Sequence, residues 1–366
     1  LLRDLSTRLR EWDWGLTAHI RDQELVAVSP PGSRPFGLAV DLGSTKIAGY
    51  LIDLETGETL ASQGIMNPQI SKGEDIITRI DFANRSPDGR TLMADLAREA
   101  LMELAQSLCA KIGAETGDIL EAAIVGNTAM HHLMLGLSVH QLARSPFVPA
   151  VRRELDVKAR DIGLDFAPGA HVYFPPNIAG FVGADHVAAL TATVGEWAHK
   201  KAMVIDIGTN TEISLIAQEK ITSVSCASGP AFEGYHIRDG VRASPGAIEK
   251  VYVWEDGVSY NTIDHAEPIG ICGSGRLDAV SQLYLVGVLD QGGRMLEGSH
   301  SRLVEKNGRL EFVLVYKEAG RRGPEISITQ KDVREVQLGK AAIQAAIKIL
   351  LSREGISEKE IHKVII

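Results

Sequence analysis

"LAVDLGSTKIAGYLIDLETGE", residues 38–58, joins two apolar runs through a short polar turn. The first run ends in Asp41 and turns through Gly43, and the second ends at the turn signal Thr56-Gly57. A further alternating run, "ETLASQGIM", follows directly. We therefore expect three consecutive antiparallel strands at this point of the chain.

The same pattern returns later in the chain. "KAMVIDIGTNTEISLI", residues 201–216, is again an apolar run that ends in Asp206, turns through Gly208 and enters a second apolar run. The two aspartates stand about 165 residues apart. Two copies of one hairpin indicate a duplicated protein with two lobes.

Length and composition limit the classes of protein that fit. A chain of 366 residues is too long for one compact core. With 38 Lys and Arg against 47 Asp and Glu, and no basic tract, nucleic acid is not an expected partner. No apolar run reaches the ~18 residues of a transmembrane helix, and no signal peptide is evident. We expect a cytoplasmic protein without membrane contact.

The three cysteines, Cys109, Cys226 and Cys272, are far apart and form no C-x-x-C pair. The chain therefore encodes neither a zinc site nor an iron–sulfur cluster locally. Reduced thiols are expected.

Proline- and glycine-rich stretches and changes of pattern along the sequence predict the domain boundaries. "SPPGSRPFG" is a linker that ends near residue 36. We expect residues 1–35 to be the tail of a preceding domain, 36–200 and 201–340 to be two lobes, and 341–366 to be a connecting helix that returns to the first lobe. The chain lacks an initiator Met and ends in "KVII", which reads as the start of a strand, so we expect a longer protein.

Two helices are predicted from apolar spacing. One lies in "TLMADLAREALMELAQSLCAKIGA", and its expected apolar face is Leu92, Leu96, Leu101, Leu104 and Leu108. The other lies in "DVREVQLGKAAIQAAIKILLSREGI" and stops at Gly355.

A strand that ends in Asp and turns through Gly presents backbone N–H groups that can bind phosphate. Gly43 allows close approach, Ser44 and Thr45 add hydroxyl donors, and Lys46 adds a positive charge. The carboxylate suits this site if a hydrated Mg²⁺ lies between it and the phosphates. The alternative is an ordinary hairpin in which the aspartate caps the turn.

A third element is glycine-rich. "GICGSGRLDAVSQLYLVGVLD" places Gly270, Gly273 and Gly275 just before an expected helix. Alone this is a weak signal, because a helix cap followed by a new helix gives the same string.

Together these three elements resemble the superfamily of actin, sugar kinases and heat-shock chaperones. Residues 41–45 resemble its first phosphate loop and residues 206–210 its second, while residues 270–275 resemble its adenosine loop. The resemblance implies an α/β fold with two lobes, each a mixed five-stranded sheet flanked by helices, and a nucleotide cleft between them. "GNTAMHHLMLGL" and "VREVQLGKAAIQAAIKIL" correspond to the two connecting helices.

Five strings are more specific than the fold: "NPQISKGEDIITRI", "VGNTAMHHLMLGL", "FPPNIAGFVGADHVAAL", "SGPAFEG" and "DVREVQLGKAAI". In this order they resemble the ATP-dependent reductive activators of corrinoid proteins, over residues 36–366. The resemblance implies ATP and Mg²⁺ as cofactors, a corrinoid protein as partner, and reduction of its cobalt from Co(II) to Co(I). It places an iron–sulfur cluster only in the full-length protein. Self-association as a homodimer stays open.

The resemblance also implies roles for individual residues. Asp41 and Asp206 are expected to hold Mg²⁺ through water and to orient the attacking water. Asn127 is expected near the γ-phosphate or, alternatively, as a helix N-cap. Glu233 is expected near the ribose or the metal, or simply in a surface loop. The residues expected to contact the nucleotide are Gly43, Ser44, Thr45, Lys46, Gly208, Thr209, Asn210, Gly229, Glu233, Gly273, Ser274 and Gly275.

Two positions depart from the family pattern. Lys46 stands where threonine is usual, and Thr211 stands where glycine is usual, which would narrow the phosphate site. His131 and His132 are expected to be packing and solvent residues rather than metal ligands, and Cys272 a small apolar filler.

Two other functions fit the same fold. A small-molecule kinase, acting on a sugar or an acid, needs a carboxylate base that the sequence does not identify. An actin-like filament protein needs a polymer contact, for which the sequence offers no sign.

Overall fold

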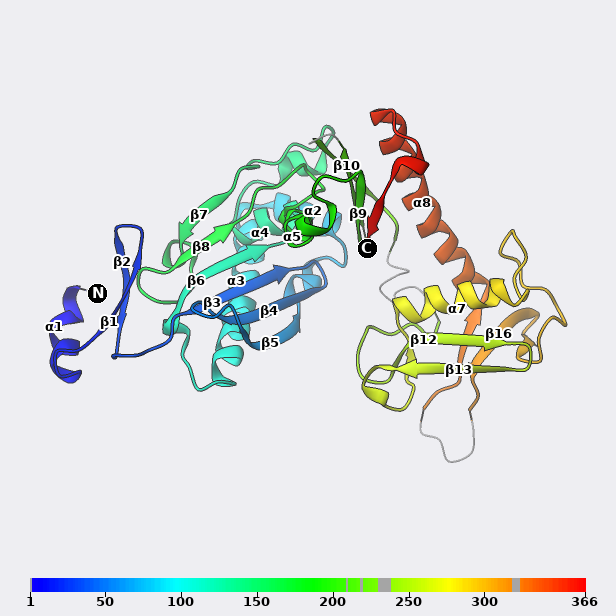
Figure 1. Ribbon diagram of the computed structural model, residues 1–366, viewed down its shortest axis with the longest axis horizontal. Coiled ribbons are helices and arrows are strands. Elements are labelled where there is room, and N and C mark those ends of the chain that lie inside the picture. The colour runs from blue at the N-terminus through cyan, green and yellow to red at the C-terminus, as the bar shows by residue number, and fades with distance from the viewer. Residues whose placement is uncertain (1, 209, 218–219, 230–237, 318–322) are drawn as a thin grey trace. The chain divides into compact units, whose positions relative to one another are not determined.

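The computed structural model describes residues 2–208, 210–217, 220–229, 238–317 and 323–366. The chain forms two compact units, Leu1–Val194 and Gly195–Ile366 (Figure 1). The boundaries predicted from the sequence at residues 35, 200 and 340 stay predictions. Among the described residues, no helix combines the length and apolarity needed to span a bilayer.

The first unit is built on a six-stranded mixed sheet. In spatial order its strands are β5 (Thr59–Met66), β4 (Lys46–Asp53), β3 (Phe36–Leu42), β6 (Ile119–Val125), β8 (His171–Phe174) and β7 (Leu155–Lys158). The three antiparallel strands predicted at its start, β3 to β5, are confirmed. Strands β6 and β8 continue the sheet in parallel, and β7 closes the edge antiparallel to β8.

Helices cover this sheet and close its core. They are α2 (Ile76–Arg85), α3 (Pro87–Ala110), α4 (Thr128–Met134) and α5 (Ala184–Ala192), with 3-10 turns at Pro68–Lys72, Thr116–Asp118, His140–Ala143 and Ala159–Ile162. The short helix α6 (Val194–Trp197) crosses the boundary between the two units. Helix α3 packs closely on β4, where a Cβ at Gly49 would lie 2.7 Å from Leu104 Cδ2. Leu101, Leu104 and Leu108 face the core as predicted, but Leu92 is exposed and Leu96 only half-buried. Met93 and Ala97 take their places because the buried stripe is offset by one residue at the start of α3.

The N-terminal segment packs against this unit. It contains α1 (Leu2–Glu11) and the hairpin β1 (Thr17–Arg21) and β2 (Glu24–Ser29). Val26 and Ala27 join the core of the unit, and Gly169 N donates to Val26 O at 2.9 Å. A Cβ at Gly169 would lie 2.5 Å from Val26 O, so the close approach requires glycine there.

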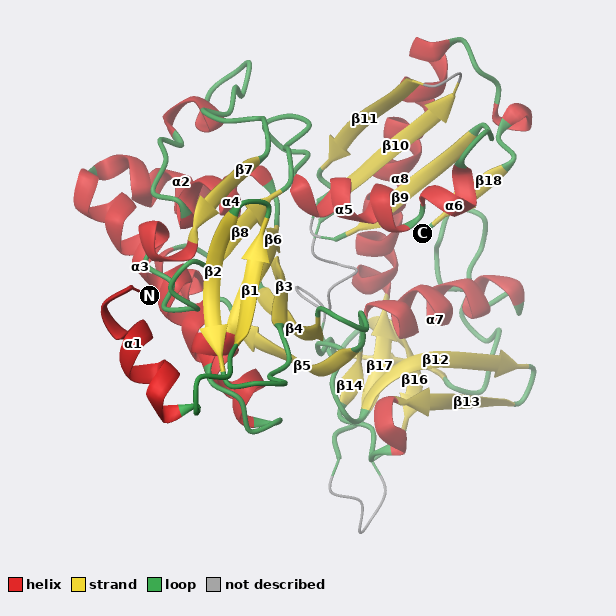
Figure 2. Cartoon of the chain, turned by 60° about the vertical axis from the view of Figure 1, so that its left-hand side comes forward, coloured by secondary structure: helices red, strands yellow, loops and turns green. Residues whose placement is uncertain are grey.

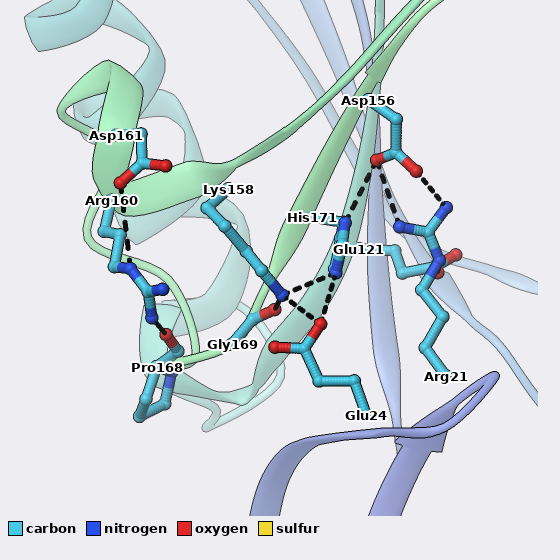
Figure 3. A network of polar contacts seen from close by, with 10 residues as sticks. All are labelled: Arg21, Glu24, Glu121, Asp156, Lys158, Arg160, Asp161, Pro168, Gly169 and His171. Carbon is cyan, nitrogen blue, oxygen red and sulfur yellow. Dashed lines mark hydrogen bonds and ion pairs between the residues drawn. The ribbon is translucent and has the colours of Figure 1, made fainter.

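Charged side chains join the hairpin to β7 and β8 (Figure 3). Arg21 Nη2 lies 2.8 Å from Asp156 Oδ2, and Lys158 Nζ lies 2.5 Å from Glu24 Oε2. His171 lies between them, with Nδ1 3.1 Å from Asp156 Oδ1 and Nε2 3.2 Å from Glu24 Oε2. The hairpin is therefore held by one apolar contact region and one polar network.

The second unit begins with a four-stranded sheet. Its order is β11 (Lys220–Cys226), β10 (Thr211–Ala217), β9 (Ala202–Ile207) and β18 (Lys363–Ile365). The predicted hairpin of β9 and β10 and the predicted terminal strand are confirmed, the latter parallel to β9. Helix α8 (Gln330–Glu354) covers one face through Ala346, Leu350 and Leu351 and stops at Gly355, as predicted.

The rest of this unit contains two three-stranded sheets. They are formed by β12 (Ala247–Trp254), β13 (Gly257–Thr262) and β14 (Gly270–Ile271), and by β15 (Leu303–Lys306), β16 (Arg309–Val315) and β17 (Ile326–Thr329). Helix α7 (Gly273–Leu285) lies along β12 (Figure 2). Short 3-10 turns are at Ile263–His265 and Glu358–Glu360.

The α/β class with mixed sheets agrees with the prediction, but the expected five strands per sheet do not. The first sheet gains β7, whose sequence "LDVK" alternates apolar and polar residues over only four positions, too short a run to predict a strand. In the second unit, the described strands are divided among three smaller sheets because β12 to β17 pair among themselves.

Candidate phosphate-binding turns

The turn between β3 and β4 presents an exposed carboxylate beside a glycine. Asp41 pairs with Ala48 of β4 and with Val125 of β6, so it stands at the end of the strand with both neighbours in register. Gly43, Ser44 and Thr45 form the turn. A Cβ at Gly43 would lie 2.5 Å from Lys46 O, so only glycine fits this backbone path.

A buried asparagine holds this turn from behind. Asn67 is 1 % exposed, and its Nδ2 donates to Gly43 O at 2.8 Å. Its backbone N–H donates to Thr45 O at 3.0 Å. Its Oδ1 accepts from Gln69 N at 3.0 Å and so caps the following 3-10 turn. The carbonyls of Gly43 and Thr45 are therefore both bonded to Asn67. These two bonds fix the backbone conformation of the turn.

Asn127 lies next to this turn, because β6 is the parallel neighbour of β3 and ends at Val125. Its Oδ1 accepts from Met130 N at 3.0 Å, so Asn127 is the N-cap of α4. The capping alternative is thus present in the structure. The expected contact with a γ-phosphate stays a prediction, and the cap places this half-buried side chain at the strand edge.

Asp185 is a further candidate for the site at the first turn, and the sequence alone did not single it out. Ala184 N and Asp185 N both donate to Gly126 O, at 3.0 and 3.3 Å. A Cβ at Gly183 would lie 2.4 Å from Asn127 Cα, so the start of α5 touches the end of β6. The string "GFVGAD" carried this signal, since an acid directly follows the glycine at the contact.

The turn between β9 and β10 repeats the arrangement in the second unit. Asp206 is exposed at the strand end and lies opposite Glu212 in the ladder. Gly208 N donates to Asn210 O at 3.1 Å and narrows the turn. Thr209, which was expected to contact phosphate, lies outside the described residues.

Two buried hydroxyls support this second turn. Ser228 Oγ lies 2.7 Å from Thr211 Oγ1 and donates to Gly208 O at 3.2 Å. A hydroxyl has one hydrogen, so Thr211 is the donor to Ser228. The expectation that Thr211 narrows the phosphate site is wrong, because its side chain is fully buried and engaged behind the turn.

Two predicted residues follow Ser228. Gly229 has φ +82°, a conformation that favours glycine. Glu233 lies outside the described residues.

Gly273, Ser274 and Gly275 form the first turn of α7. A Cβ at Gly275 would lie 2.1 Å from Ile248 O, which gives this glycine a packing reason of its own. Ser274 is exposed. Cys272 is buried, with Sγ 3.2 Å from Ile248 O, so its predicted role as a filler is confirmed. This segment belongs to the sheet of β12, whereas Asp206 and Ser228 lie around the sheet of β9.

The described side chains limit which metal and cluster sites this chain can hold. No group of three or more His, Cys, Asp or Glu suited to a metal occurs among the described residues. Mg²⁺ needs only one or two carboxylates and keeps its waters, so exposed Asp41 and Asp206 each fit a hydrated ion. The cysteines do not fit an iron–sulfur cluster, because Cys109 lies in the core of the first unit and burial raises its pKa to about 11.

The paired histidines are packing residues. His131 and His132 are both buried, which corrects the expected solvent role. His132 Nε2 accepts from Val151 N at 3.2 Å, and the ring of His131 packs edge-on against Phe174. Burial, with a contribution from His132, lowers the pKa of His131 to about 4, so this ring is neutral at pH 7.

The chain is similar to proteins that activate corrinoid proteins. Residues 36–194 match the family described as "RACo middle region", and residues 200–366 match "C-terminal domain of RACo the ASKHA domain". The chain is 35% identical over 339 residues to the corrinoid activation enzyme RamQ of Eubacterium limosum, covering 90% of this chain and 57% of that protein.

It is 28% identical over 358 residues to the [Co(II) methylated amine-specific corrinoid protein] reductase of Methanosarcina barkeri, covering 89% of this chain and 61% of that protein. A solved structure named "Reductive activator for corrinoid,iron-sulfur protein" matches with a TM-score of 0.88 and 32% identity, over 99% of this chain and 59% of that one. The chain thus spans about three fifths of the length of these relatives.

Proposed function

This chain belongs to the family of reductive activators of corrinoid proteins, and we propose that it is the nucleotide-binding and partner-docking part of such an activator. Its task is to couple ATP binding and hydrolysis to the reduction of cobalt in a corrinoid protein. The observation that supports this most strongly is the repeated turn: an exposed aspartate at a strand end, a glycine, and a buried side chain bonded to the glycine carbonyl.

Each turn offers what a Mg–nucleotide requires. Backbone N–H groups and the hydroxyls of Ser44 and Thr45 are donors for phosphate oxygens, and exposed Lys46 adds a positive charge. Asp41 and Asp206 are the residues that would hold a hydrated Mg²⁺, by accepting hydrogen bonds from its water. Bound Mg²⁺ supplies neutralisation of the phosphate charge.

The remaining site residues are proposed by the family resemblance. Gly208, Asn210 and Gly229 line the second turn, and Gly273 to Gly275 approach the adenosine. The resemblance also assigns Asn127 to the γ-phosphate, with its amide nitrogen as the donor, since its Oδ1 accepts from Met130 N. Thr209 and Glu233 complete the set outside the described residues.

The reaction adds one electron to Co(II) and gives Co(I). A shortfall on the order of 250 mV corresponds to roughly 6 kcal/mol for one electron. The described cysteines do not form a cluster that could supply the electron. The family resemblance implies an iron–sulfur donor outside these residues. ATP drives a conformational change that weakens or removes a cobalt ligand, so that Co(II) becomes easier to reduce.

The nucleotide half of the proposal is tested by calorimetry with Mg-ATP. Asp206→Asn should weaken Mg-ATP binding and abolish ATP hydrolysis without lowering the melting temperature, because this exposed side chain contributes little packing. Asp256→Asn is the matched control, an exposed aspartate in the β12–β13 turn of the same unit. Undiminished hydrolysis in Asp206→Asn would show that the metal assignment is wrong.

The partner half is tested by titrating the chain against a corrinoid protein held as Co(II) or as methyl-Co(III), with and without ATP. An activator must bind the Co(II) state more tightly, since only differential affinity lets the partner bias its conformation. Equal affinity for both states would leave a kinase-like ATPase of another acceptor as the better account.

A further inference from the structure

The string "NPQISKGEDIITRI", residues 67–80, folds around the back of the first turn. It forms the 3-10 turn Pro68–Lys72 and the first half of α2, and its first residue, Asn67, bonds to the carbonyl of Gly43. Asp75 and Thr78 form a capping box that fixes the start of α2. The segment thus holds α2 in a defined position relative to the turn.

Arg79 is the unusual residue of this segment. Its side chain is fully buried, although arginine is rarely buried without a partner. Its Nε donates to Gly73 O at 2.8 Å, and Nη1 lies 3.5 Å from Met130 Sδ. Its Nη2 has no hydrogen-bond partner, and no carboxylate forms an ion pair with Arg79, among the residues that the structure describes.

The charge of Arg79 is therefore poorly compensated. Burial lowers its pKa to about 10, against a smaller opposing effect of Asp75, so the guanidinium is still protonated at pH 7. A buried cation without an ion pair is unfavourable by itself. An anion bound close by would offset part of this cost.

Short contacts connect Arg79 to the turn. Met130 Sδ receives Arg79 Nη1 at 3.5 Å on one side and Asn67 Nδ2 at 3.7 Å on the other. Asn67 Nδ2 in turn bonds to Gly43 O at 2.8 Å. The guanidinium accordingly lies behind the Gly43–Thr45 turn, on the side opposite the groups that face outward.

We propose that Arg79 is a positioning residue of the first phosphate site, a buried positive charge that favours binding of a polyphosphate at the Gly43–Thr45 turn. This rests on the proposed function, which places phosphate at that turn. A unit charge that acts over a distance on the order of 10 Å, at the effective dielectric of a protein, changes the binding of another charge by about tenfold. The alternative is that Arg79 only supports the backbone at Gly73.

The test compares ligands that share the base but differ in phosphate. Arg79→Met removes the charge and keeps an apolar chain of similar length. We expect it to weaken Mg-ATP about tenfold, Mg-ADP less, and adenosine hardly at all. Arg85→Met removes the same charge from the exposed end of α2 and should leave all three affinities unchanged.

Each outcome decides the question. If Arg79→Met weakens adenosine and ATP by the same factor, or weakens neither, the electrostatic role is wrong. If the wild-type chain itself binds no Mg-ATP, the proposed function fails first. A melting curve of each variant reports whether it is folded.

Arg79→Lys covers the case in which Arg79→Met does not fold. A buried lysine has a strongly lowered pKa and loses its charge at a moderately alkaline pH at which arginine keeps it. We expect the ATP affinity of Arg79→Lys, relative to wild type, to fall as pH rises through this range, with adenosine unaffected. An ATP affinity equal to that of wild type at every pH between 6.5 and 9.5, or an equal loss of adenosine affinity, would overturn the proposal.

Discussion

The hydroxyl pair behind the second turn gives a prediction that tests how the turn is held. Thr211 donates to Ser228, and Ser228 donates to the carbonyl of Gly208. Both side chains are buried, at 0 % and 4 % exposure, so water does not replace a lost partner. We therefore consider Thr211→Val, Ser228→Ala and the double variant.

Because Thr211 donates to Ser228 and Ser228 donates to Gly208, the variants should lower the free energy of local unfolding by different amounts. Ser228→Ala leaves the buried donor of Thr211 and the carbonyl of Gly208 without their partner, which costs about 2 kcal/mol within the usual ~1–3 kcal/mol for such groups. Thr211→Val removes one donor and leaves the bond from Ser228 to Gly208 intact, so about 1 kcal/mol is expected. In the double variant no hydroxyl is left unsatisfied, so the loss should be smaller than the sum by about 1 kcal/mol.

Hydrogen exchange of the amides in β9 and β10 measures these losses locally, which matters because two units need not unfold as one. About 2 kcal/mol corresponds to roughly thirtyfold faster exchange for Ser228→Ala. Mg-ATP affinity should fall with it. Ser223→Ala is the control, since Ser223 pairs with Ser214 in the same sheet away from the turn and should not affect the nucleotide. Additive losses, or a larger effect for Thr211→Val, would refute the reasoning.

Three further predictions follow from single contacts. Gly43→Ala should weaken Mg-ATP binding measured by calorimetry, because its Cβ would lie 2.5 Å from Lys46 O and the turn must open. Gly275→Ala should lower the melting temperature whether or not nucleotide is present, since its Cβ would lie 2.1 Å from Ile248 O. Asp156 has a pKa lowered first by its bond to Arg21, so it stabilises the docked β1–β2 hairpin above its unfolded pKa of ~4. This contribution, at most ~1 kcal/mol, is lost as pH falls further. Limited proteolysis of the hairpin should accelerate there, and Asp156→Asn should reduce the pH dependence, with the remainder due to Glu24, whose pKa is lowered by Lys158 and His171.

The two hairpins could be predicted because their information is local. A run of alternating or apolar residues, an aspartate and a glycine within seven or eight positions specify strand, turn and strand without reference to the rest of the chain. The same holds for α8, whose stop at Gly355 is confirmed by a left-handed φ of 65°.

The supports of the turns could not be predicted in this way. Asn67 and Ser228 reach their glycines from 24 and 20 residues further along the chain, and only the folded sheet brings them there. The string containing Asn67 was recognised as specific, but its pattern does not reveal which carbonyl it bonds. Thr211 was misread for a related reason, because its departure from the family pattern does not tell that its side chain is buried against Ser228.

Glycine signals are ambiguous in a further way. A glycine that admits a ligand and one that admits a neighbouring backbone both require the absence of a Cβ. Gly275 was expected at an adenosine, and the structure gives it a contact with Ile248 O that explains it without a ligand. Its proposed nucleotide contact therefore depends on the family resemblance alone, whereas Gly43 has the exposed Asp41 beside it.

The repeated support of the turns bears on how tightly they can bind. A free loop must lose conformational entropy when an anion orders it, and this loss reduces affinity. In both turns the glycine carbonyl is already bonded to a buried side chain, an amide from Asn67 in one and a hydroxyl from Ser228 in the other. The chemistry of the two supports differs while their target atom is equivalent, so the held carbonyl, rather than any one side chain, is what the duplicated hairpin requires. It follows that Asn67→Ser and Ser228→Asn, which each place the other turn's support in this turn, should both weaken Mg-ATP binding, because each side chain fits only its own turn.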